Sequence, residues 1–65
     1  MIEAGNILKC ARKQSGLKQV DAAIAYGVSE RTYQRWENNE IQPKFVDVVG
    51  LIEGVFKVEF RDLVG

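Results

Sequence analysis

The sequence predicts a compact all-α domain of five helices, and three observations support this fold class. Apolar side chains recur at three- and four-residue steps along most of the chain, which is the spacing of an amphipathic helix. Hydrophobic residues make up 46% of the sequence and proline occurs once, so the chain is too apolar to remain disordered. Its 65 residues place it near the lower size limit of a single domain. We therefore expect residues 1–65 to form one domain in which short helices bury a small core.

The first helix is expected from Glu3 to about Ser15. Its apolar positions recur at helical spacing and include Ala4, Ile7, Leu8 and Ala11. Gly16 follows and predicts the end of this helix, because glycine adopts the left-handed backbone conformation at little steric cost.

The pattern of residues 17–37 predicts two helices joined by a glycine turn. We expect the second helix over residues 18–26 and the third from Ser29 to about Asn38. Ala23 is small enough to let two helices touch, Gly27 permits positive φ where the second helix ends, and Ser29 can cap the third. This pattern is typical of a helix-turn-helix, whose second helix enters the major groove of DNA.

One face of the expected third helix carries side chains that can recognise bases. Arg31, Gln34 and Arg35 stand at positions i, i+3 and i+4, with Glu30 at the N-terminal edge of the same face. Arginine can donate two hydrogen bonds to guanine, glutamine can pair with adenine, and glutamate can accept from cytosine N4. The alternative is a solvated face stabilised by charge pairs, but the preceding Gly-Val-Ser turn favours base recognition. Because Glu30 repels phosphate, its alternative role is to orient Arg31 or Arg35.

Residues 38–43 lack an apolar period and are expected to form a loop, in which an asparagine can adopt the left-handed conformation. Pro43 is suited to the start of a fourth helix. The buried stripe of that helix is expected to consist of Phe45, Val48, Val49, Ile52 and Val55. Gly50 and Gly54 each lower helix stability by about 1 kcal/mol relative to alanine, which indicates close packing or a soft helix.

Residues 55–64 are ambiguous between helix and strand. Val58 and Phe60 alternate with charged residues, as in a strand. Helical spacing is instead present at Phe56, Phe60, Leu63 and Val64. A strand would need a partner, and the pairing would then run across a dimer. We favour a short fifth helix from about Glu59.

Cysteine and histidine usage excludes several kinds of site. Cys10 is the single cysteine and the chain has no histidine, so it forms neither an intramolecular disulfide nor a cysteine–histidine zinc cluster. No phosphate-cradling motif and no recognisable nucleophile is present, so we expect no enzyme activity, no metal and no cofactor. The sequence also lacks a membrane-spanning apolar run and a signal-peptide pattern, which favours a cytoplasmic protein.

The formal net charge is zero, whereas a DNA-binding domain is usually basic. The charges are unevenly distributed along the chain. Residues 1–44 hold seven basic and five acidic residues, and residues 45–65 hold two basic and four acidic residues. The half that contains the helix-turn-helix is therefore the positive half.

Nearly the whole chain resembles the lambda repressor-like helix-turn-helix family, also called the Cro/C1 or XRE type. The resemblance rests on an ordered set of motifs: Arg12 before Gly16-Leu17, then Gln19, Ala23, Gly27-Val28-Ser29, Trp36-Glu37, Pro43 and the closing segment 56–64. It implies a five-helix domain with the helix-turn-helix at helices 2 and 3. It also implies a regulator of transcription that binds palindromic operators as a dimer.

The resemblance further implies roles for individual residues. Gln19 would contact a phosphate and brace the recognition helix, and Lys44 would hold a backbone phosphate. The residues implied to face base edges or neighbouring phosphates are Ser29, Glu30, Arg31, Gln34 and Arg35. Arg12 and Glu37 match a pair that bridges the first helix to the end of the third, so we assign them a structural role.

Two further apolar features have alternative interpretations. Trp36 lies three residues after Tyr33, and this helical spacing favours a place in the core or at its edge. Val20 and Ile24 form a strip at i and i+4 on the second helix, and we expect it to be buried beside the first helix. Exposure of the strip would instead indicate a contact with a protein such as RNA polymerase.

The sequence thus predicts a sequence-specific transcriptional regulator that binds double-stranded DNA, namely a Cro-like phage or bacterial repressor acting as a homodimer on a palindromic operator. Candidate dimer contacts in the C-terminal half are Phe56, Val58, Phe60 and Val64. One alternative is a protein-interaction or antitoxin-type regulatory subunit, which the zero net charge and the apolar strip favour. Another is the DNA-binding piece of a longer regulator.

Overall fold

A computed structural model describes residues 3–64, apart from the side chains of Phe60 and Val64. The helical elements are α1 (Ala4–Ser15), α2 (Gln19–Tyr26), α3 (Glu30–Glu37), α4 (Phe45–Val49), the π-helical segment η1 (Gly50–Val55) and α5 (Phe60–Val64). No strand occurs among the described residues, so the predicted all-α fold is confirmed. None of the helices in this part of the chain is long and apolar enough to cross a membrane.

The helix α1 begins and ends close to the predicted positions, but its two ends are held in different ways. At its C-terminal end Gly16 has φ 80°, and its N–H donates to the carbonyl oxygens of Arg12 and Lys13 at 3.1 and 3.2 Å. At its N-terminal end, Glu3 makes no side-chain capping bond. The N–H of Gly5 donates instead to Oδ1 of Asn39, at 3.1 Å, from the loop after α3. A distant residue therefore caps this helix.

Asn39 has φ 61°, so the expected left-handed asparagine lies at this position. The same region brings α1 very close to α3. A Cβ atom added to Gly5 would lie 2.5 Å from the carbonyl oxygen of Trp36 and 2.6 Å from that of Glu37. Only a residue without a side chain fits between these two helices.

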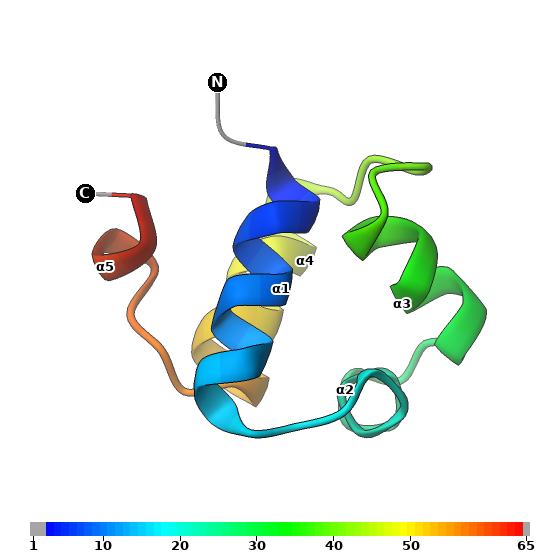
Figure 1. Cartoon of the computed structure of the whole chain (residues 1–65), viewed down its shortest axis with the longest axis horizontal. Coiled ribbons are helices and arrows are strands. Elements are labelled where there is room, and N and C mark those ends of the chain that lie inside the picture. The colour runs from blue at the N-terminus through cyan, green and yellow to red at the C-terminus, as the bar shows by residue number, and fades with distance from the viewer. Residues whose placement is uncertain (1–2, 65) are drawn as a thin grey trace.

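The turn between α2 and α3 has the features expected from its sequence. Gly27 has φ 87°, and its N–H donates to the carbonyl oxygen of Ala23 at 2.9 Å. Ser29 caps α3, because its Oγ accepts from the N–H of Thr32 at 3.1 Å. Ala23 is 1% exposed in the contact between α2 and α3, which pack against each other. Figure 1 shows α3 at one edge of the domain, with α2 below it.

The fourth helix begins later than predicted. Pro43 precedes it, Lys44 is its N-cap and Phe45 is its first helical residue. Phe45 is 70% exposed, so its assignment to the buried stripe is wrong. The stripe begins one turn later, at Val48, because the short α4 makes few contacts with helices other than η1.

The helix continues from α4 into η1, where the hydrogen bonds change to the wider π spacing. The N–H of Phe56 donates to the carbonyl oxygen of Leu51 at 2.8 Å. Leu51 and Ile52 are both fully buried, although the predicted stripe contained only Ile52. Of the two glycines, Gly50 packs closely, since a Cβ there would lie 3.2 Å from a ring carbon of Tyr26. A Cβ at Gly54 would meet open space.

The core lies between α1, α2, α3 and η1. Its largest fully buried side chains are Tyr33, Leu8, Leu51 and Ile52. Trp36 is 8% exposed, which confirms its predicted place in the core. The Trp36 ring meets those of Tyr26 and Tyr33 edge to face, with centroids 6.3 and 6.5 Å apart. Aromatic side chains of α2 and α3 thus fill the centre of the helix-turn-helix.

The C-terminal segment is helical, as favoured by its sequence. After η1 the chain turns at Lys57, which has φ 61°, and α5 packs on α1. Val58 and Leu63 are partly buried against the core. Figure 1 shows α5 and α3 on opposite sides of α1.

Gly5→Ala should lower the free energy of unfolding by about 2–3 kcal/mol, because the added methyl group would force α1 away from the end of α3. Gly54→Ala is the matched control, since its methyl group meets nothing and should raise helix stability by up to about 1 kcal/mol. Urea unfolding followed by circular dichroism measures both changes. Equal stability of the two variants would contradict the close contact at Gly5.

Candidate nucleic-acid interface

The Glu37 carboxylate at the end of α3 is the centre of a buried hydrogen-bond network. Arg12 of α1 donates to it through Nε at 2.7 Å and through Nη2 at 3.2 Å. Gln19, the first residue of α2, donates through Nε2 at 3.1 Å, and the Tyr33 hydroxyl donates as well. Arg12 also donates through Nη1 to the carbonyl oxygen of Leu17, at 3.0 Å. The network therefore joins α1, the following loop, α2 and α3.

The protonation of this network follows from its burial and its hydrogen bonds. Burial acts to raise the pKa of Glu37, but the hydrogen bonds from Arg12, Tyr33 and Gln19 outweigh it, so the pKa lies below its ordinary value. The hydrogen bond to Glu37 likewise raises the pKa of Arg12. Burial, followed by the bond to Glu37, raises the pKa of Tyr33. At neutral pH the site therefore holds a carboxylate, a guanidinium and a neutral phenol.

The predicted base-recognition residues lie on the more exposed side of α3. Glu30 and Arg31 are exposed, and Gln34 and Arg35 are half-buried. Gln34 donates through Nε2 to Oε2 of Glu30 at 3.3 Å. Glu30 therefore binds Gln34, whereas the sequence suggested Arg31 or Arg35 as its partner. Within the described residues, the guanidinium groups of Arg31 and Arg35 make no hydrogen bond or ion pair.

Three other predicted contact residues lie at the ends of helices. Ser29 is exposed, and its hydroxyl caps α3 and donates to Oγ1 of Thr32 at 2.9 Å. Gln19 is half-buried, and its amide nitrogen is directed to Glu37. Lys44 is the exposed N-cap of α4.

The predicted Arg12–Glu37 bridge is present, and the Tyr33 hydroxyl is a further partner of Glu37 that was not predicted. Tyr33 lies four residues before Glu37, a spacing that places both side chains on one side of a helix and could have revealed the contact. Gln19 was expected to contact a phosphate and to brace the recognition helix, and its hydrogen bond to Glu37 joins the first residue of α2 to α3.

The apolar strip on α2 is exposed. Val20 is 37% exposed and Ile24 is 73% exposed, so the prediction that this strip is buried beside the first helix is wrong. The side of α2 that packs inward carries Ala22 and Ala23 instead. Two small residues fill that contact and leave the larger side chains facing solvent.

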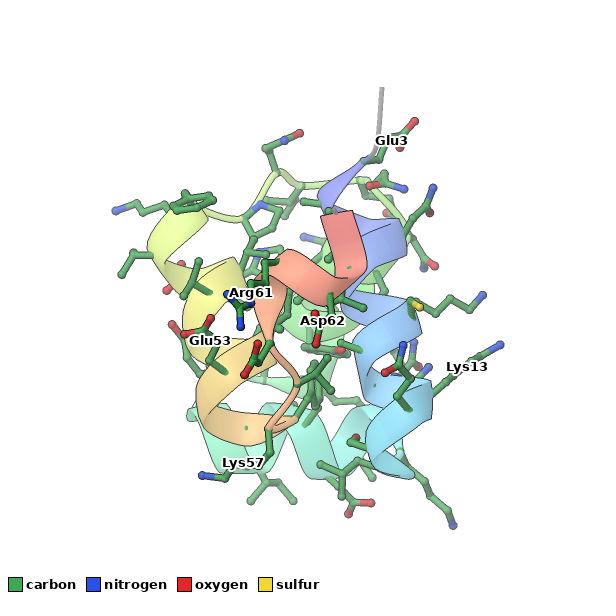
Figure 2. All side chains as sticks on the ribbon, turned by 90° about the vertical axis from the view of Figure 1, so that its left-hand side faces the viewer. Glu3, Lys13, Glu53, Lys57, Arg61 and Asp62 are labelled. Atoms are coloured by element: carbon green, nitrogen blue, oxygen red, sulfur yellow. The ribbon has the colours of Figure 1, made fainter. Side chains whose placement is uncertain are left out.

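The side of the domain away from α3 has mixed charge. Figure 2 looks onto this side, where Glu53, Lys57, Arg61 and Asp62 lie around α5. A shallow pocket of about 720 Å³ is lined by Glu53, Lys57, Val58, Glu59 and Arg61. Acidic and basic side chains alternate around this pocket, whereas Arg31 and Arg35 on α3 have no ion-pair partner among the described residues.

The candidate dimer contacts are only partly described. Phe56 is 3% exposed, so the assignment of its side chain to a dimer contact is corrected: it packs in the core of the chain. Val58 is half-buried against the core. The side chains of Phe60 and Val64 lie outside the described residues.

Three features together define a helix-turn-helix domain. These are the exposed side of α3, the turn at Gly27 and the N-terminus of α3 capped by Ser29. A model of the helix-turn-helix family matches residues 8–63, which is most of the chain. The chain therefore belongs to the helix-turn-helix family of XRE/Cro/C1 type, a family of DNA-binding transcriptional regulators. No curated protein and no solved structure matched it. Among the described residues, no three histidine, cysteine, aspartate or glutamate side chains are grouped to hold a metal ion.

Acid should destabilise the domain through Glu37. Because the pKa of Glu37 is lower in the folded chain, its stabilisation is present above the ordinary value of 4.5 and is lost as the pH falls through the folded value. Glu37→Gln should cost about 2 kcal/mol at pH 7 and remove this part of the acid sensitivity. Urea unfolding between pH 7 and pH 3 measures the effect, with the exposed Glu53→Gln as control. A constant difference between wild type and Glu37→Gln across this range would contradict the assignment.

Proposed function

We propose that this protein is a sequence-specific repressor of Cro/C1 type, from a phage or a bacterium, that places α3 in the major groove of its operator. One observation carries the proposal. The helix α3 is fixed on its inner side by the Glu37 network and presents unpaired Arg31 and Arg35 beside Gln34 on its outer side. A rigid helix with free donors on one face is suited to recognise base edges.

The neighbouring residues are suited to hold the phosphate backbone. Gln19 and Ser29 begin α2 and α3, and helix N-termini favour phosphate groups. Lys44 adds an exposed ammonium group after the loop that follows α3. Such contacts would set the position of α3 on the duplex, while the α3 side chains would provide the specificity.

A single subunit would bind weakly, because its net charge is zero and few base contacts are available. We therefore propose a homodimer that recognises two half-sites spaced by about one helical turn, ~34 Å. Val58, Phe60 and Val64 remain the proposed dimer contacts. A phage or bacterial repressor binds DNA inside the bacterial cell, so we propose that this protein acts in the cytoplasm.

Selection of bound sequences from a random duplex library tests this function. The wild type should enrich a palindromic motif, and the double variant Gln34→Ala, Arg35→Ala should not, because it loses donors of the outer α3 face. The double variant Lys13→Ala, Gln14→Ala removes a similar pair from the exposed face of α1 and should keep the motif. Absence of any enriched motif with folded wild type at low salt would exclude operator recognition.

A second proposed function is a contact with RNA polymerase or another protein through Val20 and Ile24, which the exposure of this strip favours. Ile24→Glu should change promoter output in a transcription assay without altering stability or operator affinity. Ala25→Glu places the same charge on a neighbouring exposed position of α2 and is the control. An apolar contact should also resist added salt, whereas DNA binding should weaken steeply with ionic strength. Unchanged output from Ile24→Glu would exclude this contact.

A further inference from the structure

We propose that Glu30 is a positioning residue that holds the Gln34 amide in the orientation that recognises adenine. The inference rests on the proposed function, because it assigns a base to one side chain of the α3 face. The supporting observation is a hydrogen bond between two residues that lie one helical turn apart. Nε2 of Gln34 donates to Oε2 of Glu30 at 3.3 Å. Glu30 is exposed and Gln34 is half-buried, so the amide of Gln34 can still reach a partner outside the protein.

The bond matters because a glutamine amide has two different ends. One end carries an oxygen that accepts and the other a nitrogen that donates, and an unrestrained amide can turn over and exchange them. A carboxylate only accepts hydrogen bonds. Glu30 therefore binds the nitrogen end of Gln34 and not its oxygen end, which selects one of the two amide orientations.

The held amide retains the groups that adenine requires. Nε2 carries two hydrogens, and the bond to Glu30 uses one of them. The other hydrogen and Oε1 form a donor and an acceptor that match adenine N7 and N6 in the major groove. Guanine presents acceptors at both N7 and O6, so Oε1 of Gln34 and O6 of guanine would be two acceptors facing each other with no hydrogen between them. The fixed orientation therefore favours adenine over guanine.

The negative charge of Glu30 adds to this selectivity. Its carboxylate is exposed at the first position of α3, where the helix dipole stabilises negative charge. A carboxylate at this position repels phosphate groups and lowers the affinity for DNA of any sequence. Glu30 thus weakens non-specific binding while it holds a side chain that recognises a base.

Quantitative binding of the full chain to the enriched duplex and to single-base variants of it tests the proposal. At one position in each half-site, the wild type should bind the duplex with adenine about tenfold more tightly than the duplex with guanine. Gln34→Ala should remove this difference in affinity. Glu30→Gln keeps the size of the side chain but can bind either end of the amide, so it should reduce the same preference by at least about threefold. It should also bind random duplex more tightly than wild type, because a charge that repels phosphate is lost.

Glu53→Gln makes the same change in net charge on η1 and should leave the base preference as in wild type. Glu30→Ala is a second variant at the same exposed position and should also weaken the adenine preference. An adenine preference that Gln34→Ala removes but both Glu30 variants retain overturns the positioning role and leaves the proposed function intact. Failure of the wild type to prefer any sequence overturns both proposals.

Discussion

The buried Glu37 carboxylate imposes the constraint on which the rest of this domain depends. Its hydrogen-bond donors come from three helices: Arg12 from α1, Gln19 from α2 and Tyr33 from α3. A buried carboxylate that loses a charged partner costs about 3–5 kcal/mol, a large part of the stability of a small domain. The helices are therefore stable in the arrangement that brings all these donors together, and the helix-turn-helix folds as one unit with the first helix.

This arrangement separates the two sides of α3. Its inner side satisfies Glu37 and packs Tyr33 and Trp36 in the core, whereas its outer side leaves Arg31 and Arg35 available to acceptors outside the protein. The chain as a whole is neutral, so its positive groups act locally rather than through a strong overall field. A domain of this kind gains more from precise placement of a few donors than from general attraction to DNA.

Local features of the fold were determined by the sequence alone, because they depend on the backbone conformation of a few consecutive residues. Gly16 and Gly27 end their helices with positive φ, and Ser29 caps α3. Helical periodicity also placed Trp36 and Arg31 on different sides of α3. In each case the chain within one or two turns supplies the physical cause.

Only the tertiary structure decided the features that join distant residues. Asn39 caps α1 from 34 positions away, and Glu37 meets Arg12 across 25 positions. The exposure of Phe45 and Ile24 likewise depends on which neighbouring helices cover them, since their apolar character alone favours burial. Periodicity indicates that a residue lies on one side of a helix. Whether that side is covered, and by which partner, is determined only when all the helices pack together.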